Sequence, residues 1–251
     1  MKPYILFLLL TPILSAQEIV EQSTNNQAKE IINKYFEVIG GIKKIKKIQT
    51  LEKKFEVEIS GVPNLYIMGR MLYKTPRFFV SETVKTVGDV SQIHTLKYNN
   101  QDCVLSKSYE KNGEYNTSQT KIEGELLDEK MKNFIPFPLL EALENNTSFS
   151  FIGTTKHQNK ELQKIHMIEN NIQDTTFFFF DTKTHYLVRK EIRGPKTNKI
   201  TEYTEYQKIN GIYFPFIEKS IIEIDEKPAQ ESLNKVLKIE MNIEIDITEF
   251  E

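Results

Sequence analysis

The sequence predicts an α+β fold built on one antiparallel sheet that curls strongly. From Leu237 to Thr248 an apolar residue occupies every odd position and a polar one every even position, the pattern of a long strand with one apolar face. Roughly a dozen runs along the chain have the period of a β-strand and are separated by turn residues. Only two or three helical patterns interrupt them, without regular strand–helix alternation. So many twisted strands are expected to curl rather than lie flat.

The first sixteen residues predict a signal peptide that precedes one mature domain, residues 17–251. Lys2 is followed by an apolar run from Tyr4 to Leu14, and the small residues Ser15 and Ala16 fit a cleavage site before Gln17. The run is too short for a permanent membrane span, and a buried N-terminal helix is the alternative. Because no cysteine lies near the cleavage site, we expect a periplasmic protein without a lipid anchor.

Composition indicates a single exported domain without disulfides. Cys103 is the only cysteine among 251 residues, so no intrachain bridge can form. Without Lys2, 32 basic residues stand against 35 acidic ones, a net charge of −3. Such a chain is a poor partner for nucleic acid, and we expect none. The mature length suffices for a sizeable core in one domain.

One helix is predicted from Gln27 to Val38, where apolar residues recur at three- and four-residue steps before the stop Gly40–Gly41. The segment Ile42–Ile48 then alternates isoleucine with lysine and predicts a short turn with a basic outer face. A solvated lysine face is the simpler interpretation of Lys43–Lys47, and docking on an anionic lipid or an acidic partner is the alternative.

The period changes to two after Thr50. Phe55, Val57 and Ile59 alternate with charged residues, and Gly61–Asn64 breaks the chain before a second run, Leu65–Lys74, so that the two runs predict a hairpin. Turn residues separate further strand candidates in the first half of the chain, at residues 77–87, 92–98, 102–109 and 115–122.

The middle of the chain predicts two helices before strand patterns resume. Glu125–Asn133 is compatible with a helix, and a short apolar helix is expected at Leu139–Leu143. Consecutive aromatics at Phe177–Phe180 place bulk on both faces of a strand, which indicates either core packing or the lining of a ligand cavity. The later strand candidates are residues 148–154, 162–169, 174–181, 185–193, 199–208, 212–225 and 236–250.

No motif indicates catalysis. The four histidines show no metal-ligand spacing, and the sequence contains no nucleophile elbow, phosphate loop or dinucleotide fingerprint. Cys103 lies beside Val104 and Leu105 and is interpreted as a small buried hydrophobic residue. We therefore expect a protein that is not an enzyme and has no cofactor and no metal. The histidines in question are His94, His157, His166 and His185.

Several turns resemble those of a known family. A helix that ends in Gly40–Gly41 before a strand at Leu51–Gly61, the break at Pro76, the hairpin Asp181–His185 and the segment Tyr206–Pro215 are similar to exported proteins of the outer-membrane lipoprotein-sorting (LolA/LolB-like) superfamily. The resemblance, which concerns fold more than activity, implies an unclosed half-barrel of about eleven strands with helices lidding the concave face. The resemblance further implies that the concave face can accept acyl chains.

Two functions follow as hypotheses. The first is a periplasmic binder or carrier of a hydrophobic ligand, either a lipid or the acyl chains of a lipoprotein, with envelope proteins as further partners. The second is a sensor or scaffold that contacts proteins through a sheet edge or through Lys43–Lys47. Burial of methylene groups would drive ligand binding, and methionine suits a wall that must accept variable chains. The residues expected to line the cavity are Phe55, Val57, Ile59, Ile67, Met71, Tyr73, Leu140, Leu143, Ile239, Met241, Ile243 and Ile245.

Overall fold

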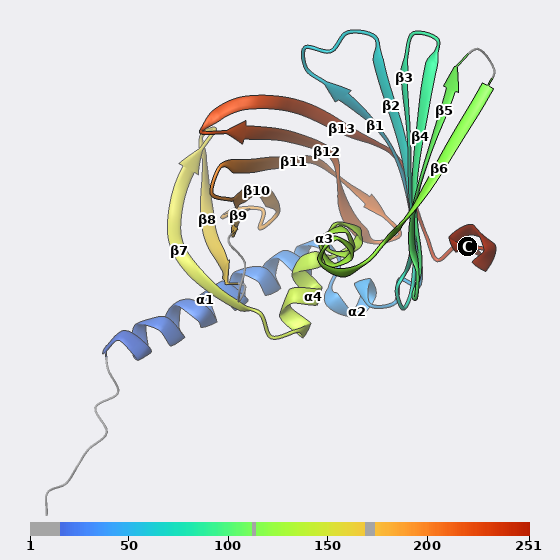
Figure 1. Ribbon diagram of the computed structural model, residues 1–251. Coiled ribbons are helices and arrows are strands. Elements are labelled where there is room, and N and C mark those ends of the chain that lie inside the picture. Colours follow the sequence, from blue (N-terminus) through green and yellow to red (C-terminus); the bar gives the residue numbers. More distant parts are fainter. Residues whose placement is uncertain (1–15, 112–113, 169–173) are drawn as a thin grey trace, which may run out of the picture.

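The computed structural model describes residues 16–111, 114–168 and 174–251 (Figure 1). The predicted signal peptide therefore lies outside the described residues, except for Ala16, at which the first helix begins. Among the described residues, no helix combines the length and the apolar character needed to cross a membrane.

Within the described residues, four α-helices and one short 3-10 helix accompany the sheet. They are α1 (Ala16–Ile39), α2 (Ile42–Ile45), α3 (Gly124–Phe134), α4 (Pro138–Glu144) and the 3-10 helix η1 (Ile247–Phe250). The predicted apolar face of α1 is confirmed, because Ala28, Ile32 and Phe36 are buried in the core. The helix ends where Gly40 adopts a φ of 131°, a conformation that favours glycine.

All thirteen strands form one sheet, in the spatial order β6-β5-β4-β3-β2-β1-β13-β12-β11-β10-β9-β8-β7. Every pair is antiparallel, so the chain makes one meander from β1 to β6 and a second from β7 to β13, which join where β1 pairs with β13. The strands are β1 (Thr50–Ile59), β2 (Leu65–Lys74), β3 (Phe78–Val87), β4 (Val90–Asn99), β5 (Cys103–Lys111), β6 (Glu114–Ile122), β7 (Ser148–His157), β8 (Lys160–Ile168), β9 (Thr175–Asp181), β10 (Leu187–Arg193), β11 (Thr197–Ile209), β12 (Ile212–Ile224) and β13 (Lys227–Met241).

The sheet curves around the helices and stays open, with β6 and β7 at its edges (Figure 1). The predicted α+β fold on a curved antiparallel sheet is confirmed. The strand number implied by the resemblance is wrong, since the sheet has thirteen strands rather than eleven. The alternation patterns were the better guide, because each predicted strand segment overlaps one observed strand.

The prediction of one strand through Leu237–Thr248 is also wrong. β13 begins earlier, at Lys227, and ends at Met241. The register between β1 and β13 shifts at Leu237, which is an extra residue in a β-bulge. Leu237 is therefore 50% exposed, although Val236, Ile239 and Met241 are buried. The perfect alternation in the sequence is thus broken by a change of register.

The chain leaves the sheet after Met241. Asn242 adopts a positive φ of 55°, and its Oδ1 accepts a hydrogen bond of 2.8 Å from the backbone N–H of Gln49. Ile243 and Ile245, predicted in the inner wall, consequently lie beyond the strand. Ile245 packs instead with a cluster on the convex face of the sheet, formed by Leu72, Val80 and Phe250. Figure 1 shows the C-terminal segment on this outer side of β1–β6.

The concave face carries the two larger cores. We define it by Leu51, which pairs with Tyr73 on β2 and with Met241 on β13. The main core lies between α1, α4 and the strands β1 and β7–β13, and a second core lies beneath α3. Cys103 is buried in the second core, as predicted, with Phe79, Leu96 and Ile122.

The four consecutive phenylalanines of β9 serve both faces of the sheet. Phe178 and Phe180 point into the main core. Phe177 and Phe179 lie on the outer face, where the Lys164 ammonium is 4.0 Å from the Phe177 ring centroid and 5.4 Å from that of Phe179. Covering by cations thus explains how a strand with aromatics on both sides remains shielded from water.

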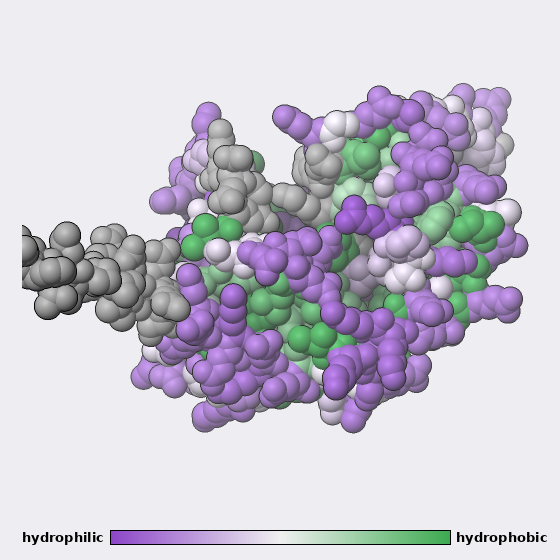
Figure 2. All heavy atoms as spheres, turned by 90° about the horizontal axis from the view of Figure 1, so that it is seen from below, coloured by the Kyte–Doolittle hydropathy of each residue, from purple (hydrophilic) through white to green (hydrophobic). Residues whose placement is uncertain are grey.

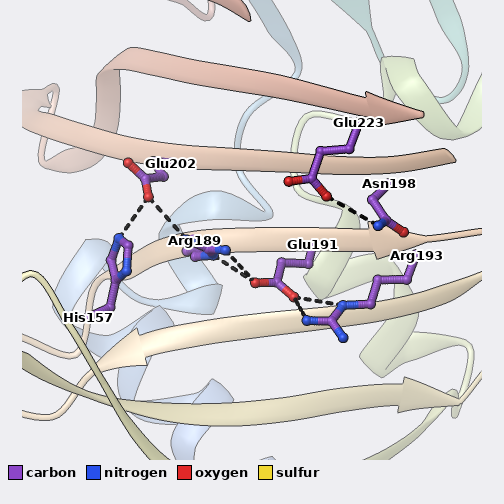
Figure 3. Close-up of polar contacts among 7 residues, drawn as sticks. All are labelled: His157, Arg189, Glu191, Arg193, Asn198, Glu202 and Glu223. Atoms are coloured by element: carbon purple, nitrogen blue, oxygen red, sulfur yellow. Dashed lines mark hydrogen bonds and ion pairs between the residues drawn. The ribbon is translucent and has the colours of Figure 1, made fainter. Parts of the chain in front are cut away.

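An ion-pair network continues this outer layer across β10 and β11 (Figure 3). The buried carboxylate of Glu191 accepts hydrogen bonds from Arg189 and Arg193. Oε1 of Glu202 accepts a 3.3 Å hydrogen bond from Arg189. The same oxygen lies 2.8 Å from Nε2 of His157. The network links the neighbouring strands β10 and β11 to the end of β7 on the side of the sheet away from the helices.

Candidate ligand-binding cavity

A cavity of about 340 Å³ lies between the helices and the concave face of the sheet. Strands β1–β3 and β9–β13 form its wall, and α1 with the segment 135–139 covers it. Aromatic side chains dominate the lining, among them Tyr35, Phe137, Phe178, Tyr203 and Phe214. Figure 2 views the molecule from below and shows apolar side chains in the middle of its underside, surrounded by hydrophilic residues.

A second pocket of about 450 Å³ adjoins the first and reaches the rim of the sheet. Both pockets share Tyr73, Phe79 and residues 135–137, so this connection between α3 and α4 lies at their boundary. Charged pairs hold α4 to the rim on two sides. Lys46 forms an ion pair with Glu144, and Arg77 lies 3.9 Å from Glu141.

One polar group stands out in the first cavity. Lys53 of β1 donates a 2.6 Å hydrogen bond to Oε1 of Glu218 on β12, and both side chains are only about one-fifth exposed. Asn234 lies on β13, the strand between β1 and β12. Its Nδ2 is 3.5 Å from Oε2 of Glu218. The antiparallel order β1-β13-β12 brings these three side chains together on the concave face.

Three tyrosines enclose this polar group. Burial raises the pKa of Tyr203 and Tyr206 well above the ordinary value, and the carboxylate of Glu218 raises it further. Burial likewise raises the pKa of Tyr35, although a hydrogen bond with Tyr206 partly offsets this effect. The Tyr206 hydroxyl also donates a 2.7 Å hydrogen bond to the backbone carbonyl oxygen of Leu187. All three therefore stay neutral phenols at physiological pH.

Only some of the residues predicted to line the cavity do so in the structure. Met71, Tyr73 and Ile239 line the first cavity, and Leu140 lines the second pocket together with Tyr73. Two further predicted residues, Leu143 and Met241, pack in the main core.

The other predicted lining residues lie elsewhere. Four of them share the concave face but lie farther along the first hairpin, toward its turn, and line neither of the two pockets. The remaining two, Ile243 and Ile245, follow the end of β13. The four on the hairpin are Phe55, Val57, Ile59 and Ile67.

Sequence reasoning missed the polar members of the cavity. Lys53 occupies an odd position between Leu51 and Phe55, in the apolar register of β1, and such an inward charge could have indicated a polar partner. No comparable local signal identifies Glu218 or Asn234, because they meet Lys53 only through the pairing of β13 with β1 and β12.

Neither the histidines nor the acids assemble into a metal site in the described part of the chain, where no group of three or more His, Cys, Asp or Glu could hold an ion. His166 stacks near the Phe177 ring, at 5.2 Å between centroids, and His157 contacts Glu202 on the outer face. Burial raises the pKa of the Cys103 thiol, so that it stays protonated.

Comparison with known proteins gives similarity in fold at low sequence identity. No protein-family model matches the sequence, and no curated protein matches it. The structure of a DUF1329 family protein from Desulfovibrio piger superposes with a TM-score of 0.57 and 10% identity, covering 92% of this chain and 97% of that one.

A putative outer membrane lipoprotein-sorting protein domain from Vibrio parahaemolyticus superposes with a TM-score of 0.52 and 8% identity, over 90% of this chain and 97% of that one. The resemblance seen in the sequence is thereby confirmed for the fold. This chain has the fold of the outer membrane lipoprotein-sorting protein domain.

Proposed function

We propose that this protein is a periplasmic binder or carrier of a hydrophobic ligand, a lipid or an acyl chain, which it holds in the cavity on the concave face. The observation that carries the proposal is the cavity itself, about 340 Å³ of space with a mainly apolar and aromatic lining between helices and sheet. The protein acts by binding and release and catalyses no reaction.

Burial of the ligand's methylene groups drives binding. Each methylene moved from water into the cavity contributes about 0.8 kcal/mol, which offsets the similar cost of withdrawing that methylene from a micelle or a membrane. The cavity is at the small end of the range for ligand sites, roughly 300–1,000 Å³. Its size favours one chain, whose end can continue past Phe137 into the second pocket at the rim.

The fold supports this function and the location. A solved structure with the same fold is described as a putative outer membrane lipoprotein-sorting protein domain, and its chain is covered over 97% of its length. Together with the leader pattern at Met1–Ala16, the fold supports export to the periplasm.

A protein-binding scaffold is supported less well. That function would be favoured by a concave face filled with its own side chains, whereas this face contains a cavity. The basic turn is also partly engaged within the molecule, because Lys46 pairs with Glu144 and Lys44 Nζ lies 3.4 Å from the Gly211 carbonyl oxygen. Lys43 and Lys47 are exposed, and no contact of theirs indicates a partner.

A paired substitution on one strand tests the proposal. Met71 points into the cavity from β2, whereas Met68 lies on the opposite face of the same strand and is 58% exposed. Met71→Trp should occupy the cavity and lower the affinity for a fluorescent fatty-acyl probe at least about tenfold, which corresponds to 1.4 kcal/mol. Met68→Trp adds the same ring outside the cavity and should bind like wild type. Equal binding by both variants, or no binding by wild type, would contradict the proposal.

A further inference from the structure

The polar group inside the cavity includes an acceptor that the protein leaves unpaired. Oδ1 of Asn234 is buried and receives no hydrogen bond from the described residues. The orientation of this amide is fixed by its neighbour, since Nδ2 faces Oε2 of Glu218 and the reversed amide would place two acceptors against each other. A buried acceptor without a donor is unfavourable, so this position suits a ligand that carries one.

A donor lies on the other side of Glu218. The ammonium group of Lys53 has three N–H bonds, and its hydrogen bond to Glu218 Oε1 uses one of them. Lys53 and Asn234 both contact the Glu218 carboxylate and both line the cavity. The positive charge of Lys53 is balanced by Glu218, so these three residues carry no net charge together.

We propose that these residues bind the uncharged, hydroxyl-bearing end of an amphiphile whose alkyl chain fills the cavity. The hydroxyl donates to Oδ1 of Asn234 and accepts from Nζ of Lys53, because a hydroxyl donates and accepts at once. The inference rests on the proposed function and narrows it to long-chain alcohols and monoacylglycerols, which share this chemistry.

Other polar ends fit this group less well. A carboxylate only accepts, so beside Asn234 it would leave Oδ1 unpaired and would meet the negative charge of Glu218, even though Lys190 also lines the cavity. An ammonium would meet the positive charge of Lys53. A methyl ester accepts from Lys53 but leaves Asn234 unpaired.

Four probes of equal chain length test the inference: a monoacylglycerol, a long-chain alcohol, a fatty acid and its methyl ester. We expect wild type to bind both hydroxylated probes about tenfold tighter than the methyl ester, because the ester leaves Asn234 Oδ1 unpaired. Asn234→Leu, which removes the acceptor, should abolish this preference without weakening ester binding. The tighter of the two hydroxylated probes identifies whether a glycerol or a simple alcohol is preferred.

The outcomes separate this inference from the proposed function. Equal affinity of wild type for ester and hydroxylated probes, or tightest binding of the fatty acid, would overturn the inference and leave hydrophobic binding intact. An unchanged preference in Asn234→Leu would overturn it as well. Failure of all four probes to bind would overturn both. Because the probe series is measured on wild type, the test does not depend on the folding of the variant.

Discussion

Removal of one buried charge tests the outer ion-pair network that links β10, β11 and the end of β7. Glu191 is 4% exposed, and its two carboxylate oxygens face two arginines. Oε1 accepts a 2.8 Å hydrogen bond from Nε of Arg189. Oε2 accepts two hydrogen bonds from Arg193, one of 3.0 Å from Nε and one of 2.7 Å from Nη2. In Glu191→Gln one oxygen is replaced by an NH₂ group, which turns its hydrogens toward arginine donors.

The expected loss is about 2 to 3 kcal/mol of unfolding free energy. A hydrogen bond between charged groups is worth roughly 1.5–3 kcal/mol, and the substitution removes the charge from all of them. The total for these hydrogen bonds is discounted for two reasons. The Arg193 side chain is 53% exposed and can be hydrated, and Arg189 retains its ion pair with Glu202 at 3.3 Å. Urea denaturation at pH 7 measures the change.

The same loss should depend on pH. Burial would raise the pKa of Glu191, but the hydrogen bonds and charges of Arg193 and Arg189 outweigh it and lower the pKa below its ordinary value of 4.5. The contribution is therefore complete above pH 4.5 and is lost as the pH falls through the lowered pKa. The difference in unfolding free energy between wild type and Glu191→Gln should therefore become smaller below pH 4.5.

A matched variant controls for the loss of one surface charge. Glu223 lies on the same outer face, and its carboxylate accepts a 3.2 Å hydrogen bond from Nδ2 of Asn198 (Figure 3). Glu223→Gln should change the free energy of unfolding by less than about 0.5 kcal/mol. If Glu191→Gln proved as mild as this control at pH 7, the assignment of Glu191 as the centre of the network would be refuted.

Two further substitutions test the fold. Phe250→Ala should lower the unfolding free energy by about 3 kcal/mol in chemical denaturation, since Phe250 is 1% exposed against Leu72 and Val80; a loss below about 1 kcal/mol would show that the C-terminal segment is not anchored there. Gly40→Ala should cost more than about 1 kcal/mol, because the added Cβ would lie 2.6 Å from the Gly211 carbonyl oxygen at a φ of 131°. In Gly61→Ala the added Cβ meets open space, so this variant should lose less stability than Gly40→Ala. Equal effects of the two variants on thermal unfolding would contradict the close approach of Gly40 to the Gly211 carbonyl oxygen.

The local patterns of the sequence predicted most of the fold. The apolar face of α1, the short helix α4 and the strand segments follow from periodicity and turn residues, which depend only on neighbours along the chain. The bulge at Leu237 did not follow, because it is a property of the pairing between β13 and β1. The pattern of alternation itself contained no sign of it.

The candidate cavity was predicted only in part, for a similar reason. Met71, Tyr73 and Ile239 were expected on an apolar inner face, and they line the cavity. The partners of Lys53 could not be predicted, because Lys53 and Glu218 are far apart in sequence and meet across β13. Long-range strand order, rather than composition, determines the chemistry of this site.

Native mass spectrometry of the protein, purified without detergent, tests the central proposal most directly. We expect a species heavier by one lipid molecule, released on denaturation, with an uncharged hydroxylated polar end. Met71→Trp should be isolated without it, and Met68→Trp should retain it. A bare wild-type protein that also takes up none of the four amphiphiles would contradict binding of a hydrophobic ligand in this cavity.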